Sequence, residues 1–306
     1  DGAQIALGSG RYDLNNPFIN TVKASSPSSG TNGAINVYAQ ATEPFYYDIN
    51  TSVVYDFYGY YYDDATLGTA VKANDAITYP ITIDGTQDVM YATTDKKEDI
   101  KNTQVNEEHQ AYGAWAARRG VQPTLNFKHA LSQFTFQIKR GNGSYSEDLT
   151  VQSVQILGSN IGNLTVVGST PGYVAAADDN MNDSFTLQED MLLTPQSQDY
   201  QQVDGALMVA PDQEKVRVKV TLSAENYSPN GGIIVYEFDL QAKDLKDGNN
   251  NNESAGATKF EAGKSYRADI IVYGPEEVEF KVTLDSWKDG GWVEYDPDNE
   301  NNAPVA

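Results

Sequence analysis

The chain has 306 residues, more than one average hydrophobic core requires, so two domains or one large all-β domain are the alternatives. Its formal net charge is −22, from 43 acidic and 21 basic residues, and this charge would repel the phosphates of nucleic acids and anionic membranes. We therefore exclude nucleic-acid binding. Cysteine is absent, which excludes disulfides, thiolate metal sites and thiol nucleophiles.

No segment approaches the 18 apolar residues that a membrane-spanning helix needs, so no membrane span is expected. The chain starts at Asp1-Gly-Ala-Gln-Ile with neither an initiator Met nor an apolar signal region. We interpret it as a processed or truncated export product.

Short β-capable segments fill the first third of the chain. They are residues 4–7, 17–22, 34–39, 52–62 and 76–83, with a Ser/Gly-rich connection at 24–33. In the tyrosine-rich segment 52–62, apolar side chains occupy both alternating faces, so we expect both faces to be covered. Pro80 indicates an edge strand or a bulge.

Residues 107–119 are compatible with one helix. Glu107 and Glu108 at its start and Arg118 and Arg119 at its end complement the helix dipole, although Gly113 interrupts the pattern. We place the domain boundary just before Pro123, which gives domains 1–122 and 123–306.

Segment 124–139 shows the alternation of a β-strand with one change of parity. Leu125, Phe127 and Leu131 lie on one parity, and Phe134 and Phe136 lie on the other. This change predicts a bulge or tight corner near Ser132-Gln133. Six further strands and a hairpin at Gly274-Pro275 follow, so the fold class is all-β, a β-sandwich or tandem sandwiches with at most one or two short helices.

Three sequence motifs resemble those of the fimbrillin-like (Mfa-like) surface proteins of Bacteroidetes. They are Asp88-Val-Met-Tyr-Ala92, Phe127-x-His-Ala-Leu-Ser132, and Tyr266-x-Ala-Asp-Ile270 followed by Trp287-x-Asp-Gly290. The resemblance covers nearly the whole chain. It implies two tandem transthyretin-like β-sandwich domains, the first smaller than the second.

The same resemblance implies a function as a structural and adhesive subunit of a fimbria, or pilus. In that family a lipoprotein precursor, lipid-anchored just before this start, is exported through the outer membrane to the cell surface. A protease then cuts after a basic residue near the N-terminus, and β-strand exchange with other fimbrial subunits follows. Arg11 and Lys23 are the candidate cleavage residues, and ordinary solvated charge is the alternative interpretation of each.

Catalytic and metal chemistry find little support, and we expect no enzyme and no cofactor. With two histidines and no cysteine, a zinc site built from three or more His or Cys ligands is impossible. We interpret His129 as a buried histidine rather than a general base, and His109 as a solvated one. Structural calcium at the acidic segments 178–183 or 296–300 is a minor hypothesis.

A non-polymerising, glycan-binding surface lipoprotein is the alternative function. Tyr58 and Tyr60 are then the candidate aromatic residues that would stack on sugar rings, whereas packing between sheets is the interpretation we favour for both. The polar, proline-containing tail 295–306 is a poor strand to insert into a neighbour, so the position of the subunit in a fimbria stays open.

Overall fold

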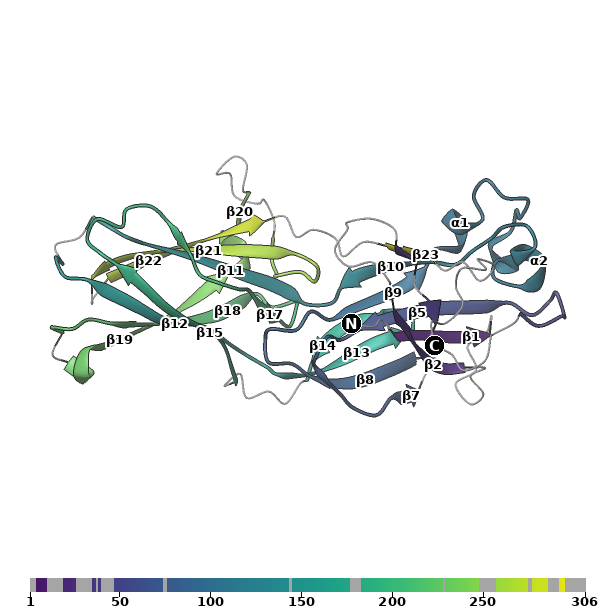
Figure 1. Ribbon diagram of the computed structural model, residues 1–306, viewed down its shortest axis with the longest axis horizontal. Coiled ribbons are helices and arrows are strands. Elements are labelled where there is room, and N and C mark those ends of the chain that lie inside the picture. Colours follow the sequence, from purple (N-terminus) through teal and green to yellow (C-terminus); the bar gives the residue numbers. More distant parts are fainter. Residues whose placement is uncertain are drawn as a thin grey trace.

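The structure, a computed structural model, describes residues 4–9, 19–25, 35–36, 38–39, 47–73, 76–142, 145–176, 183–227, 229–247, 257–274, 277–285 and 292–294. Two β-rich lobes lie end to end along the long axis of the molecule (Figure 1). Each lobe contains two sheets, which confirms the all-β fold class.

The first lobe has a larger and a smaller sheet. The larger sheet contains, in spatial order, β3 (Ile35–Asn36), β23 (Trp292–Glu294), β10 (Thr124–His129), β9 (Met90–Thr94), β5 (Tyr55–Tyr61), β1 (Gln4–Ser9), β2 (Ile19–Ser25) and β4 (Tyr38–Ala39). The smaller sheet contains β14 (Gly172–Ala175), β13 (Ile161–Val167), β8 (Ala76–Thr82) and β6 (Thr66–Leu67), with β7 (Val71–Ala73) also paired to β8. The two sheets pack face to face, because the rings of Tyr60 in β5 and Tyr79 in β8 lie 5.0 Å apart.

The second lobe is likewise built from two sheets. One contains β16 (Gln201–Gln202), β11 (Ser132–Arg140), β21 (Ser265–Gly274), β22 (Glu277–Asp285) and β20 (Lys246–Asp247), with β17 (Leu207–Val209) also paired to β11. The other contains β15 (Asp183–Leu193), β12 (Leu149–Gly158), β18 (Lys215–Ser223) and β19 (Ile233–Gln241). The hairpin expected at Gly274-Pro275 is confirmed, since β21 and β22 pair antiparallel.

The single helix expected over 107–119 is wrong. In its place the chain forms the short 3₁₀ helix η1 (Glu108–Gln110) and the four-residue helix α2 (Ala114–Ala117). Between them Tyr112 has φ +56°, a left-handed conformation that no α-helix continues through. Helix α1 (Lys96–Asp99) precedes them, and the short 3₁₀ helices η2 (Pro229–Gly232) and η3 (Ala242–Asp244) lie in the second lobe.

The change of parity near Ser132 marks the passage of the chain from one lobe to the other. β10 ends at His129 in the first lobe and β11 begins at Ser132 in the second, with Ala130 and Leu131 fully buried between them. The predicted corner is therefore confirmed, and it is a change of sheet.

Strands from both sides of residue 123 share the first lobe. β10 pairs with β9 and β13 pairs with β8, while β23 pairs with β10 near the end of the chain. The division into domains 1–122 and 123–306 stays a prediction, and in this topology the second part contributes four strands to the first lobe: β10, β13, β14 and β23.

Candidate strand-exchange site

The first strand of the chain lies inside the larger sheet of the first lobe, between β5 and β2. Six consecutive residues of β1 pair with β5, from Gln4 opposite Tyr60 to Ser9 opposite Tyr55. On its other side β1 pairs with β2, and the register shifts between Ile5 and Leu7. β1 is therefore an internal strand, and its removal would leave two unpaired edges within the sheet.

The neighbouring strand β5 is covered on both faces, as its sequence predicts. On the outer face, Phe57 and Tyr61 pack against a small apolar cluster, and the Phe57 ring meets Tyr112 edge-on at 5.5 Å. The cluster consists of Met90, Ala92, Leu125 and Phe127. Gly59 faces the same cluster, because a Cβ on this residue would lie 2.8 Å from the Phe127 ring.

The segment of short helices between β9 and β10 is fastened to this outer face. Its buried residues Val105, Ala111, Tyr112, Ala116 and Val121 form a second small core. The Tyr112 hydroxyl donates to the Asp99 carboxylate, which also accepts from the Thr124 N–H at 2.9 Å. Burial, together with this hydrogen bond, raises the pKa of Tyr112. No pattern in the sequence indicated that Asp99 holds this segment.

The two candidate sugar-stacking residues lie on the inner face of β5. Tyr60 is 3% exposed and packs between Tyr62 and Tyr79, and Tyr58 is half-buried against the main core. A ligand-stacking role for the pair stays a prediction, and the burial of Tyr60 favours packing between the sheets.

The two candidate cleavage residues are placed differently relative to β1 and β2. Arg11 lies outside the described residues, in the connection 10–18 that joins these two strands. Lys23 lies within β2, paired with Gln4 of β1, and the next residue, Ala24, pairs with Ala39 of β4.

Two of the three sequence motifs meet where the lobes join. His129 is 7% exposed, and its Nδ1 lies 2.9 Å from an Asp88 carboxylate oxygen. The strands that carry the motifs pair antiparallel, with His129 opposite Met90. His129 is thus buried as expected, but its bonded partner is a carboxylate of the other motif, which sequence reasoning missed. The sequence feature that could have indicated this contact is that Asp88 and His129 each lie in one of the recognised motifs.

Backbone hydrogen bonds continue this junction into the second lobe. Ala130 N–H donates to the Val89 carbonyl at 2.7 Å, and Gly263 N–H donates to the Leu131 carbonyl at 2.9 Å. The residues between the motif strand β10 and β11 are therefore held from both lobes. This arrangement holds the strands in place at the junction.

A fimbrillin-like family model matches residues 10–287. The chain belongs to the fimbrillin-like family. Its fold is similar to that of a fimbrial protein from Bacteroides vulgatus, with 14% identity, 93% of this chain and 92% of that chain covered, and a TM-score of 0.50. No curated protein sequence gives a significant match.

Two solved Porphyromonas gingivalis proteins are more distant in structure. The tip fimbrial protein Mfa3, with a C-terminal truncation, is 11% identical over 94% of each chain, with a TM-score of 0.36. The fimbrilin FimA is 9% identical over 96% of this chain and 90% of that chain, with a TM-score of 0.33. Membership of the fimbrillin-like family supports a fimbrial role at the cell surface for this chain.

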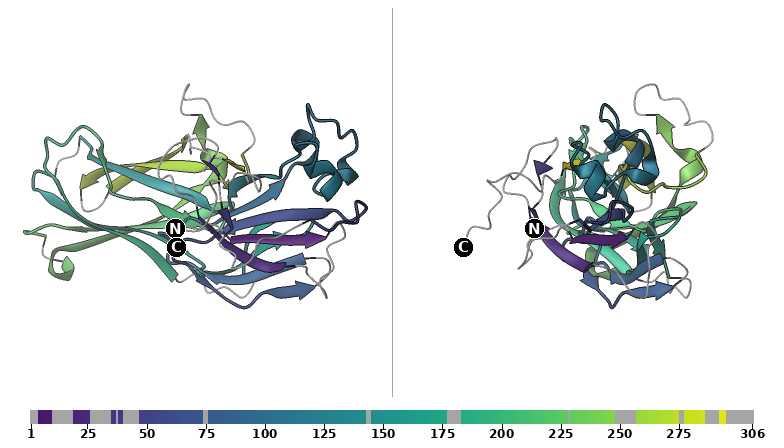
Figure 2. Two further views of the ribbon diagram at one scale, coloured as in Figure 1. Left: turned by 45° about the vertical axis from the view of Figure 1, so that its right-hand side comes forward. Right: turned by 90° about the vertical axis from the view of Figure 1, so that its right-hand side faces the viewer.

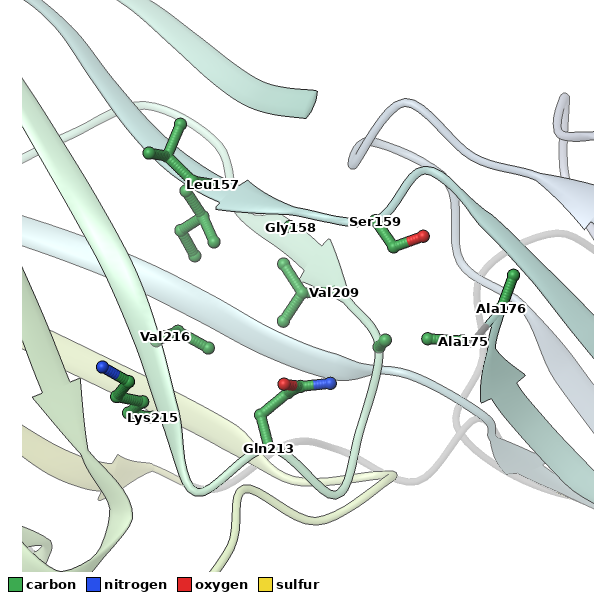
Figure 3. A pocket seen from close by; sticks show the side chains of 11 residues that line it. Leu157, Gly158, Ser159, Ala175, Ala176, Val209, Gln213, Lys215 and Val216 are labelled. Atoms are coloured by element: carbon green, nitrogen blue, oxygen red, sulfur yellow. The ribbon is translucent and has the colours of Figure 1, made fainter. Parts of the chain in front are cut away.

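A small hollow of about 120 Å³ lies beside the junction in this fimbrillin-like fold (Figure 3). Its walls come from the end of β12, the end of β14 and the residues around Ala210, and they are mainly small and apolar. The polar groups are Ser159, Gln213 and Lys215, and the Lys215 ammonium is bound to Asp239 at 2.7 Å. This composition gives no basis for a specific ligand.

Metal and membrane features of the fimbrillin-like chain can be assessed over the described residues alone. Within them no group of three His, Cys, Asp or Glu side chains is arranged to hold a metal. Of the two segments that carry the calcium hypothesis, 178–183 and 296–300, residues 178–182 and 296–300 lie outside the described part, and Asp183 is the first residue of β15. His109 is exposed, as expected, and its Nδ1 lies 3.2 Å from a Glu107 carboxylate oxygen. No helix among the described residues has the length and apolar character to cross a membrane.

Proposed function

We propose that this chain is a structural and adhesive subunit of a cell-surface fimbria and joins other subunits by β-strand exchange after proteolytic removal of β1. Its precursor would be a lipoprotein exported through the outer membrane. Family membership supports the fimbrial role. The observation that carries the exchange step is the position of β1, which is the first strand in sequence but an internal strand of its sheet.

Loss of β1 would expose hydrogen-bonding groups that a neighbouring subunit can satisfy. Six residues of β5, from Tyr55 to Tyr60, would lose their partners on that side, and β2 would lose its pairing with β1 while its pairing with β4 remains. Unpaired edge groups next to apolar surface favour the addition of a strand, since the inserted backbone restores the hydrogen bonds of the sheet. A strand supplied by another subunit would then replace β1.

We assign the cut to Arg11 rather than Lys23. A protease needs an extended and accessible segment, and connections between strands meet this need better than paired strands do. A cut after Arg11 would separate β1 from β2 in the connection between them. A cut after Lys23 would have to open a segment paired with β1 and β4.

An arginine-specific protease tests this proposal on the intact chain. Wild-type protein and the control Lys23→Gln should lose residues 1–11 and form filaments, as followed by intact mass and negative-stain electron microscopy. Arg11→Gln should stay uncut near its N-terminus and monomeric. Filaments formed by uncut Arg11→Gln, or a complete cut after Arg11 that leaves the wild type monomeric, would contradict the proposal.

A further inference from the structure

A buried cation, Arg140, ends strand β11 in the second lobe. Its side chain is 1% exposed, and it follows Phe134, Phe136 and Ile138 on the core-facing side of β11. The connection from β11 to β12, which begins after Arg140, lies at the end of the second lobe that is remote from the first lobe (Figure 2, left). Arginine is almost never fully buried unless it is paired, so its partners decide what this position does.

Most of the hydrogen-bonding capacity of this guanidinium is unused. An arginine side chain carries five N–H donors. In Arg140, Nη2 donates to the Tyr145 carbonyl at 2.7 Å, and the Tyr145 ring centroid lies 5.5 Å from Cζ. Nε and Nη1 are both buried and have no hydrogen-bond partner. Buried polar atoms without a partner are rare in folded proteins, and each one requires an explanation, such as a bound ion.

The charge of Arg140 also lacks a counter-charge. None of the ion pairs among the described residues includes Arg140, although the sequence has 43 acidic and only 21 basic residues. Burial lowers the pKa of the guanidinium, and the attraction of Tyr145 and Asp148 offsets only part of this effect. Because arginine stays protonated in proteins, a buried guanidinium is costly until an anion reaches it.

We propose that Arg140 binds a small monovalent carboxylate at this end of the second lobe. The planar guanidinium matches the two oxygens of a carboxylate, and charge-assisted hydrogen bonds of this kind are stronger than those between neutral groups. A bound carboxylate supplies the missing counter-charge. It also accepts from the N–H donors of Arg140 that the chain itself leaves without a partner.

Burial and charge restrict the ligand to a small and singly charged one. A polymer has no open path to the buried guanidinium, whereas a small anion reaches such a group when the covering segment opens locally. Glu147 and Asp148 lie in the connection to β12, and the whole chain carries a net charge of −22. These charges repel phosphate or sulfate more strongly than a carboxylate with a single charge.

NMR of the arginine side chains tests this site on the uncleaved chain, and the result does not depend on strand exchange. With isotope-labelled arginine, the Nε–H signal of Arg140 is identified by its absence in Arg140→Lys. Sodium acetate then replaces sodium chloride at constant ionic strength. The Arg140 signal should shift and reach saturation, with its midpoint at about 1–50 mM acetate, because so small a ligand gains only weak affinity.

Two other arginines serve as internal controls in the same spectra. The Nε–H groups of Arg217 and Arg267 are already bound to carboxylates, those of Asp239 at 2.9 Å and Asp269 at 3.0 Å. Their signals should therefore stay in place. An Arg140 signal that does not move with acetate would overturn the proposal, and equal movement of all three signals would do so too, because it would show a general effect of the salt.

Thermal denaturation gives a second readout of the same site. Acetate should raise the melting temperature of the wild type more than that of Arg140→Met, which removes the charge and keeps a side chain of similar length. An equal rise in both proteins would contradict binding at Arg140. Should Arg140→Met fail to fold, the acetate titration of the wild type decides the question alone.

Discussion

At the scale of single residues, the Asp88–His129 pair connects two distant motifs at the joint between the lobes. His129 is buried while the Asp88 side chain is 27% exposed, so the carboxylate reaches the imidazole from the surface side. A buried ring nitrogen left without a partner costs about 1–3 kcal/mol of stability. The pair therefore positions the end of β10 before the chain enters the second lobe.

Removal of the Asp88 carboxylate tests whether the pair stabilises the fold. We expect Asp88→Ala to lower the free energy of unfolding by about 1–3 kcal/mol, measured by urea denaturation, because the imidazole stays buried without its acceptor. Glu107→Ala is the matched control. It removes a carboxylate from a second histidine pair, Glu107–His109, in which both side chains are more than 60% exposed, and should change stability by less than about 0.5 kcal/mol. Equal effects of the two substitutions would show that burial of the pair is irrelevant.

The buried Tyr266 makes the stability of the folded chain depend on pH in the alkaline range. Burial raises the pKa of Tyr266 to about 12 from a usual value of 10.0, so the folded chain keeps the phenolic proton that the unfolded chain loses. The resulting stability is complete below pH 10 and is lost as the pH rises toward 12. Tyr266→Phe should flatten this alkaline decline in urea denaturation measured between pH 9 and 12, and an unchanged slope would contradict the assignment.

At the scale of elements, the Phe127 ring of β10 reaches across β9 to Gly59 of β5. A methyl group at Gly59 would lie 2.8 Å from the Phe127 ring, closer than side-chain carbons pack. We expect Gly59→Ala to destabilise the chain by about 1–3 kcal/mol in chemical denaturation, because the core must shift to admit it.

A double-mutant cycle tests whether this close approach is the cause. Phe127→Leu removes the ring, so Gly59→Ala should cost clearly less in that background than in the wild type. Identical costs in both backgrounds would show that the effect comes from the backbone of β5 and not from the ring.

The existence of most elements could be predicted from the sequence, whereas their partners could not. Alternation located the strands and the change of parity near Ser132, because each side chain of a strand reports which face is buried. Alternation carries no information on which sheet a strand joins, so it could not predict that β10 and β11 belong to different lobes. The helix over 107–119 failed because the buried Tyr112 adopts φ +56°, a tertiary constraint that propensity does not include.

The candidate site was predictable to a similar degree. The resemblance implied cleavage near the N-terminus followed by strand exchange, but the internal position of β1 between β5 and β2 depends on pairs of residues that lie 46 to 56 positions apart in the sequence. Tyr60 could be assigned to packing by its apolar neighbours, and the structure buries it.

At the scale of the whole molecule, net charge opposes the compact state. A charge of −22 on one chain creates self-repulsion that dissolved salt screens within about 10 Å at 0.1 M. The melting temperature should therefore rise as sodium chloride is added from low ionic strength, as measured by calorimetry. A melting temperature that falls over this range would show that attractive pairs such as Lys215–Asp239 outweigh the repulsion.

The absence of cysteine makes release of β1 directly testable. In the variant Ala6→Cys/Tyr58→Cys the two cysteines lie at opposed positions of β1 and β5. A disulfide between them would hold β1 covalently to β5. Lys219→Cys/Glu237→Cys, opposed in β18 and β19, is the matched control in the second lobe.

The decisive measurement is filament formation by the stapled chain after cleavage with the arginine-specific protease, with and without reductant. If subunits join by exchange of β1, the oxidised Ala6→Cys/Tyr58→Cys variant stays monomeric although cut, and reductant restores its filaments, while the control assembles in both states. Filaments from the cut and oxidised Ala6→Cys/Tyr58→Cys variant would contradict strand exchange at this site.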